Sequence, residues 1–185
     1  MSPTPQLSFA VLADQRATIV AELGDKVERD AIATLSLADR DLLAGSGSLG
    51  WCDVELAKRY KDAVGVQIGK GSLEFQRWVI KRASARTVHG LWRVLLTQFW
   101  DEALVKRIPI LYQRTFDLGA MTAEFESKGT ASFVVSGWPR IPEYDIVGLQ
   151  VGIESILQLL GREGASAVPT RTQTGVFYRV RWKTK

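Results

Sequence analysis

The hydrophobic periodicity of this 185-residue chain changes near Phe116, and no other feature constrains the fold as strongly. Before Phe116 the apolar residues recur at helical spacing, and after it they alternate with polar residues, with one helical stretch inserted. A chain of this length suits a single domain. We therefore predict one α+β domain over 1–185, in which an N-terminal helical part (1–115) packs on a C-terminal antiparallel ββαββ part (116–185).

The C-terminal part contains two predicted hairpins with a helix between them. The first hairpin turns at Lys128-Gly129, and the second turns across Gly175. The helix between them covers Tyr144 to Leu160, where apolar residues fall near one face.

Charged residues on the predicted strands suggest how the sheet is arranged. We expect Arg179 and Arg181 to face Glu124 and Glu126 across neighbouring strands. The outermost strands leave a sheet edge that invites pairing with another copy, so a homodimer is an open alternative to a monomer.

In the helical part, turn and cap residues mark where the elements begin and end. Leu7 to Val11 alternates briefly, which favours a short strand. Gly24 separates two short helices, and Asp53 and Ser72 are suited to cap two more. We expect Pro109 to close the helical part.

The scarcity of histidine and cysteine excludes most catalytic and metal chemistry. With one histidine, His89, and one cysteine, Cys52, the chain cannot build a multi-histidine or four-cysteine zinc site. Gly65 to Ser72 lacks the spacing of a phosphate-binding loop, and no Gly-x-Ser-x-Gly nucleophile elbow is present. We therefore expect a protein that is not an enzyme.

The sequence also indicates the cellular compartment in which we expect the protein. No apolar run approaches the ~18 residues of a membrane span, and the first residues do not resemble a secretory signal. A single cysteine cannot make an internal disulfide. These observations predict a cytoplasmic protein with no membrane contact.

The net charge of +4 is concentrated in one segment. Lys58 to Arg93 carries a charge of +7, and the remainder of the chain is slightly acidic. On a continuous helix over 75–100, one basic strip would form, made of Arg82, Arg86, His89 and Arg93. Such a strip predicts binding to an acidic protein partner or small ligand, with nucleic acid as the alternative.

Aromatic residues supply a second candidate surface. Six tryptophans are many for this length, and most are expected in the core. Trp92, Trp100 and Tyr112 are our candidates for lining a pocket between the two parts.

The order of several short motifs resembles a known group of proteins. These motifs are Gly24-Asp25, Trp51, Val66-x-x-Gly69, Leu95 to Trp100, Ile108-Pro109-Ile110-Leu111-Tyr112, Asp117-x-Gly119, Gly137-Trp138-Pro139, Gly148-x-x-x-Gly152, Leu160-Gly161 and Tyr178-Arg-Val-Arg-Trp182. The chain resembles an uncharacterised myxobacterial-type family, distantly similar to the H-NOX and 4-vinyl-reductase-like ligand-binding domains. The resemblance covers about residues 7–182.

The resemblance implies a helical part wrapped on a ββαββ unit, with a ligand pocket between them. H-NOX domains bind haem through a histidine and hold its propionates with a Tyr-x-Ser-x-Arg motif. Here Tyr112-Gln-Arg114 departs from that motif, and the cysteine cluster of zinc-binding 4-vinyl-reductase-like members is missing. We therefore expect no cofactor and no metal, and retain haem ligation by His89 as an alternative.

Together these observations predict a non-enzymatic sensory or adaptor domain that binds a protein partner or small ligand between its two parts. Two alternatives remain open. One is nucleic-acid binding by the strip of Arg82, Arg86 and Arg93, and the other is a haem or other cofactor sensor.

Overall fold

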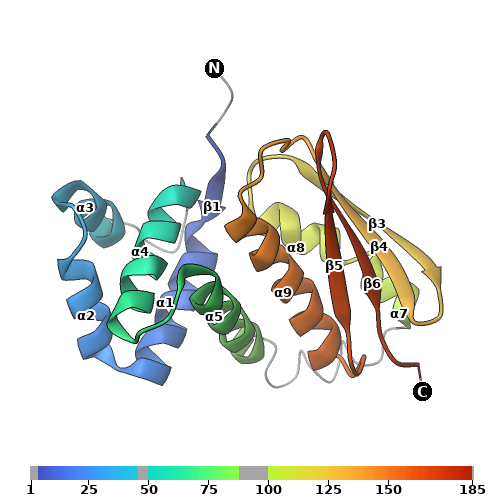
Figure 1. Cartoon of the computed structure of the whole chain (residues 1–185), viewed down its shortest axis with the longest axis horizontal. Coiled ribbons are helices and arrows are strands. Elements are labelled where there is room, and N and C mark those ends of the chain that lie inside the picture. The colour runs from blue at the N-terminus through green and yellow to red at the C-terminus, as the bar shows by residue number, and fades with distance from the viewer. Residues whose placement is uncertain (1–3, 46–49, 88–99, 185) are drawn as a thin grey trace. The chain divides into compact units, whose positions relative to one another are not determined.

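The computed structural model describes residues 4–45, 50–87 and 100–184 and divides into two compact units (Figure 1). The helical unit comprises the chain up to Ala83 together with Thr115–Leu118. The sheet unit comprises Ser84–Arg114 together with the chain from Gly119 onward. Helices and a four-stranded antiparallel sheet confirm the expected α+β class. Within the described ranges, no helix is long and apolar enough to cross a membrane.

The helical unit is built from short helices and one small two-stranded sheet. Its elements are β1 (Gln6–Ser8), α1 (Phe9–Leu23), α2 (Asp25–Ala33), α3 (Leu37–Gly45), β2 (Trp51–Asp53), α4 (Val54–Gln67) and most of α5 (Ser72–Thr87). The carboxylate of Asp53 accepts a hydrogen bond from the Glu55 N–H at 2.8 Å, which caps α4 as expected. The fully buried Tyr60 places α4 at the centre of this unit.

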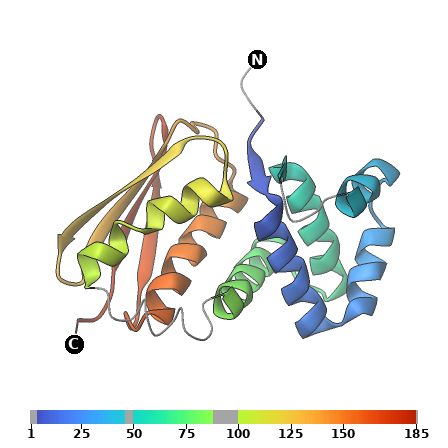
Figure 2. The ribbon, with the colours of Figure 1, turned by 180° about the vertical axis from the view of Figure 1, so that it is seen from behind.

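The sheet unit carries the remaining elements, with strand order β3-β4-β6-β5. They are α7 (Asp101–Val105), α8 (Ile108–Thr115), β3 (Ala120–Ser127), β4 (Thr130–Ser136), α9 (Glu143–Leu159), β5 (Ser166–Arg171) and β6 (Gly175–Arg181). Alternate strand residues are buried on one face, which we call the inner face, and Phe133, Tyr178 and Val180 on this face are 0% exposed. The Tyr178 hydroxyl donates to the Ile146 carbonyl of α9 at 3.0 Å, so α9 packs against the inner face. Figure 2, the view from behind, shows α8 lying across the sheet.

Three expectations about local structure need correction. The N-terminal strand does not reach Val11, because β1 ends at Ser8, opposite Trp51 at the start of β2, and Phe9 and Val11 lie in α1 instead. Pro109 does not close the helical region, since it lies in the first turn of α8, where its missing N–H costs no helix hydrogen bond. The second hairpin turns at Thr172–Thr174, and Gly175 is the first residue of β6. A Cβ there would lie 2.2 Å from the Val135 carbonyl oxygen, so glycine is required by close packing on β4.

The charged residues of the sheet are also arranged differently from the expectation. Arg179 pairs with Ser132 on β4 and with Val168 on β5. Glu124 pairs with Ser132 from the other side, so β4 separates the acidic strand from the basic one. Glu124 and Arg179 are therefore not cross-strand neighbours, and no ion pair joins them in the described part of the chain.

Candidate functional site

Helix α5 carries the described part of the basic segment on its exposed surface. Arg77, Lys81, Arg82 and Arg86 are all solvent-accessible, whereas Phe75 is fully buried. At about 100° per residue, Arg77 and Lys81 lie roughly 140° around the helix from Arg82 and Arg86. The basic residues therefore form two pairs on different sides of α5.

The two arginines of the predicted strip that the structure describes differ in their partners. Arg82 Nε lies 3.9 Å from Glu22 Oε2 on α1, at the limit of an ion pair between exposed groups. Arg86 makes no ion pair with any residue that the structure describes. Of the two described arginines, Arg86 is therefore the better placed to bind an external anion.

The rest of the strip falls outside the described residues. His89, Trp92 and Arg93 belong to the range 88–99, so their contribution stays a prediction. Trp100 has an extended backbone, with φ −65° and ψ 157°. The helix assumed over 75–100 therefore does not continue to its expected end.

The two described aromatic candidates have different surroundings. Trp100 is 72% exposed and precedes α7, whereas Tyr112 on α8 is 3% exposed. The Tyr112 hydroxyl lies beneath Gly119, where an added Cβ would come within 3.2 Å of it. Tyr112 is thus part of the sheet-unit core, and Trp100 is the candidate that remains open to a ligand.

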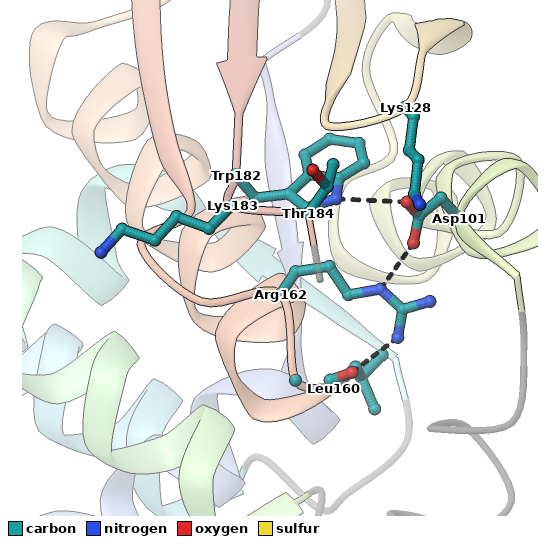
Figure 3. Close-up of a pocket in the computed structure, with 8 residues that line it drawn as sticks. Asp101, Lys128, Leu160, Arg162, Trp182, Lys183 and Thr184 are labelled. Carbon is teal, nitrogen blue, oxygen red and sulfur yellow. Dashed lines mark hydrogen bonds and ion pairs between the residues drawn. The ribbon is translucent and has the colours of Figure 1, made fainter.

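A pocket of about 430 Å³, lined by several charged side chains, lies beside the start of α7 (Figure 3). The Asp101 carboxylate accepts hydrogen bonds from Arg162 Nε at 2.9 Å and from Trp182 Nε1 at 3.3 Å. Arg162 also donates to the Leu160 carbonyl at 2.6 Å, and Figure 3 shows Lys128 reaching toward Asp101.

This network joins α7, the end of α9 and the end of β6, and sequence reasoning missed it. Its three principal members are distant in the chain and belong to no motif, so no local signal could have indicated it. The Asp101 carboxylate and its basic partners largely fulfil one another's hydrogen-bonding capacity. The network therefore connects parts of the fold and is not well suited to bind a ligand.

Few described side chains could serve as an axial ligand to a metal. Burial raises the pKa of the Cys52 thiol to about 11, so its thiolate form is disfavoured near neutral pH. Burial also raises the pKa of the Tyr60 and Tyr178 hydroxyls. In the ranges that the structure describes, no group of three or more His, Cys, Asp or Glu residues could hold a metal ion. His89 is the only imidazole in the whole sequence.

Comparison with known proteins identifies the fold. No protein-family model matches the chain, and no curated protein matches it either. Among solved structures, the Fe(II) unliganded H-NOX protein from K. algicida is 9% identical with a TM-score of 0.66, covering 97% of this chain and 98% of that one. An oxygen-binding H-NOX domain related to soluble guanylate cyclases is 11% identical with a TM-score of 0.66, covering 96% of both chains. A third structure, from a study of haem distortion in the H-NOX family, is 11% identical with a TM-score of 0.67, covering 96% of both chains.

The chain therefore has the fold of H-NOX domains, as the sequence resemblance implied. At this level of identity the comparison shows the fold alone. The narrower myxobacterial-type family is not confirmed, because no family model matches.

The expectation that the chain has no cofactor is contradicted by the same comparison. The similar structures are H-NOX proteins described in an Fe(II) form, as an oxygen complex, and in the study of haem distortion. The inference failed because the missing Tyr-x-Ser-x-Arg motif argues against one set of propionate contacts and not against the cofactor itself.

Proposed function

We propose that this chain is a haem-binding sensor domain in which His89 ligates the haem iron. The observation that carries the proposal is the H-NOX fold, which extends over 96% of the chain in the comparison with an oxygen-binding domain. Haem bound through His89 would supply an iron to which a diatomic gas could bind.

The available donor groups fit this assignment. His89 is the single imidazole of the chain, and neutral imidazole is a common axial ligand of haem iron. The Cys52 thiol competes poorly, because it is 4% exposed and its raised pKa keeps it protonated. One imidazole without a competing thiolate favours histidine-ligated haem.

Two arginines that precede His89 in the sequence suit the two propionates of haem. Arg86 precedes His89 by three positions and has no ion-pair partner among the described residues, and Arg82 precedes it by seven. A guanidinium binds a carboxylate through two parallel hydrogen bonds, which favours arginine for this role. We assign Arg82 and Arg86 to the propionates, in place of the Tyr-x-Ser-x-Arg motif.

The visible absorption spectrum tests the iron ligand. After reconstitution with haemin, we expect a Soret band that His89→Ala abolishes and added imidazole restores. The control Cys52→Ala should keep the band, because the proposal gives that thiol no role. A wild-type protein that takes up no haemin, or a His89→Ala protein with the wild-type spectrum, would show that the proposal is wrong.

Haem affinity tests the propionate assignment. We expect the double variant Arg82→Ala with Arg86→Ala to bind haemin at least about tenfold more weakly, since charge-assisted hydrogen bonds are lost. The double variant Arg77→Ala with Lys81→Ala removes the same charge from the other side of α5 and serves as the matched control. Equal losses in both proteins would mean that overall charge, and not position, governs binding.

The other side of α5 favours a second function. Arg77 and Lys81 are exposed one turn apart and form no ion pair with a described residue. We propose that this pair docks an acidic surface of a protein partner, which would receive the signal. The variant Arg77→Glu with Lys81→Glu should lose binding to poly-glutamate while retaining haemin. If the wild-type protein instead binds a short DNA duplex more tightly than it binds poly-glutamate, and this affinity falls steeply as the salt concentration rises, the nucleic-acid alternative is favoured.

A further inference from the structure

The two edges of the sheet differ in whether they are protected against pairing. Strands β5 and β3 are the edge strands in the order β3-β4-β6-β5. Pro169 lies inside β5, and proline has no N–H to offer to a neighbouring strand. Strand β3 spans Ala120–Ser127 and contains neither proline nor lysine, and its register with β4 is regular up to Phe125, with one shift between Phe125 and Ser127.

The outer side of β3 has no partner in the described structure. Strand β3 pairs only with β4 there, in a continuous register from Ala120 to Phe125. The β3–β4 hairpin forms one margin of the sheet in both views (Figures 1 and 2). A regular strand of this length with open N–H and C=O groups is a template for another strand.

The residue pattern of β3 suits pairing with itself. Met121, Ala123 and Phe125 are buried or half-buried on the inner face, whereas Thr122 and Glu124 are exposed on the other face. In an antiparallel pair, residues that lie opposite each other point to the same face of the sheet. When the two strands are identical and related by a twofold axis, this requires the axis to pass beside a residue and not between two residues. An axis at Glu124 would place two carboxylates together, but an axis at Ala123 places each Glu124 opposite the partner's Thr122.

We propose that β3 pairs antiparallel with β3 of a second copy about a twofold axis at Ala123, joining the two sheets into one. This register also places Met121 opposite the partner's Phe125, so the inner faces of both copies remain apolar and lie on the same side. Pairing in this register buries more of the half-buried Ala123 and Phe125 side chains, and it places no two like-charged side chains directly opposite each other across the interface. The proposal is independent of haem binding, because none of these residues is assigned to the cofactor.

Sedimentation equilibrium of the full chain, over a wide concentration range, tests both the dimer and its register. We expect the wild-type protein to dimerise. Thr122→Glu should raise the dimer dissociation constant about tenfold, because two symmetry-related carboxylate pairs are created. Thr122→Lys should lower it by a similar factor, because the same two contacts become attractive.

Matched controls separate pairing from general effects of charge. Val168 is 60% exposed on the other edge strand, β5, so it accepts a charge without loss of packing. Val168→Glu and Val168→Lys should leave the dissociation constant unchanged, and circular dichroism verifies that all four variants are folded. A wild-type protein that stays monomeric at every concentration would overturn the proposal. A dimer that responds equally at both positions, or only at Val168, would overturn it too.

Discussion

The two units are stabilised in different ways. In the helical unit, charged and polar side chains connect helices that are distant in sequence: Glu28 accepts hydrogen bonds from Arg16 Nε at 2.8 Å and from the Tyr60 hydroxyl at 3.0 Å. Arg59 donates two hydrogen bonds to Asp39, at 2.7 and 3.0 Å. In the sheet unit, the strand ladders are covered by apolar side chains of the inner face, which are 0% exposed at Phe133 and Tyr178.

This difference shows which perturbations each unit should resist. Apolar packing depends on volume and is almost insensitive to pH, whereas paired charges depend on protonation and on each partner being present. We expect the sheet unit to respond mainly to changes of side-chain size, and the helical unit to changes of charge.

The largest expected effect is the loss of core volume in the sheet unit. Phe133→Ala should destabilise the protein by about 3–5 kcal/mol, because a large side chain is removed from a close-packed site. Denaturant unfolding measures this loss, and hydrogen exchange should rise more over 119–184 than over 4–83. The control Val168→Ala changes a side chain that is 60% exposed and should cost less than about 0.5 kcal/mol.

Removing a shared acceptor in the helical unit should have an intermediate effect. Glu28→Gln keeps the shape but removes the charge that Arg16 and Tyr60 share, and should cost about 2 kcal/mol. Here exchange should increase over 4–83. The control Asp30→Asn disrupts an exposed ion pair with Lys26 and should cost less than about 0.5 kcal/mol. If Glu28→Gln lowers the free energy of unfolding no more than its control does, the hydrogen bonds of Glu28 do not stabilise the helical unit in the way we infer.

The smallest effect concerns pH. The hydrogen bond from Arg59 holds the pKa of Asp39 below its usual value of 3.8 in the folded protein. The lowered pKa adds stability above pH ~4 that is lost as the pH falls through the folded value. Asp39→Asn should therefore flatten the acid side of the stability curve by less than about 1 kcal/mol, measured by urea unfolding from about pH 5 to the acid limit. An unchanged acid slope would contradict this assignment.

Local sequence patterns predicted much of the secondary structure. The change of periodicity near Phe116 correctly indicated a mixed fold, and the helix expected over 144–160 is observed as Glu143–Leu159. These features depend on residues within one or two turns of each other, so a single sequence contains the information.

Features that depend on contacts between residues distant in the chain could not be predicted from local sequence patterns. Strand β1 exists because Leu7 lies opposite Cys52, and the edge position of β3 depends on β6 returning beside β4. The same limitation misled the charge argument, since Glu124 and Arg179 alternate correctly along their strands but are separated by β4.

The sequence by itself determined the inventory of chemistry: one imidazole at His89, one thiol, a basic segment, and no Tyr-x-Ser-x-Arg motif. It also determined the fold class, because apolar spacing sets which backbone geometry can bury a face. The sequence showed only a distant resemblance to H-NOX domains, and the tertiary structure decided that the chain has their fold; this comparison contradicted the expectation of no cofactor. The physical reason is that strand order, burial and partners depend on contacts between residues far apart in the chain, which local patterning does not encode.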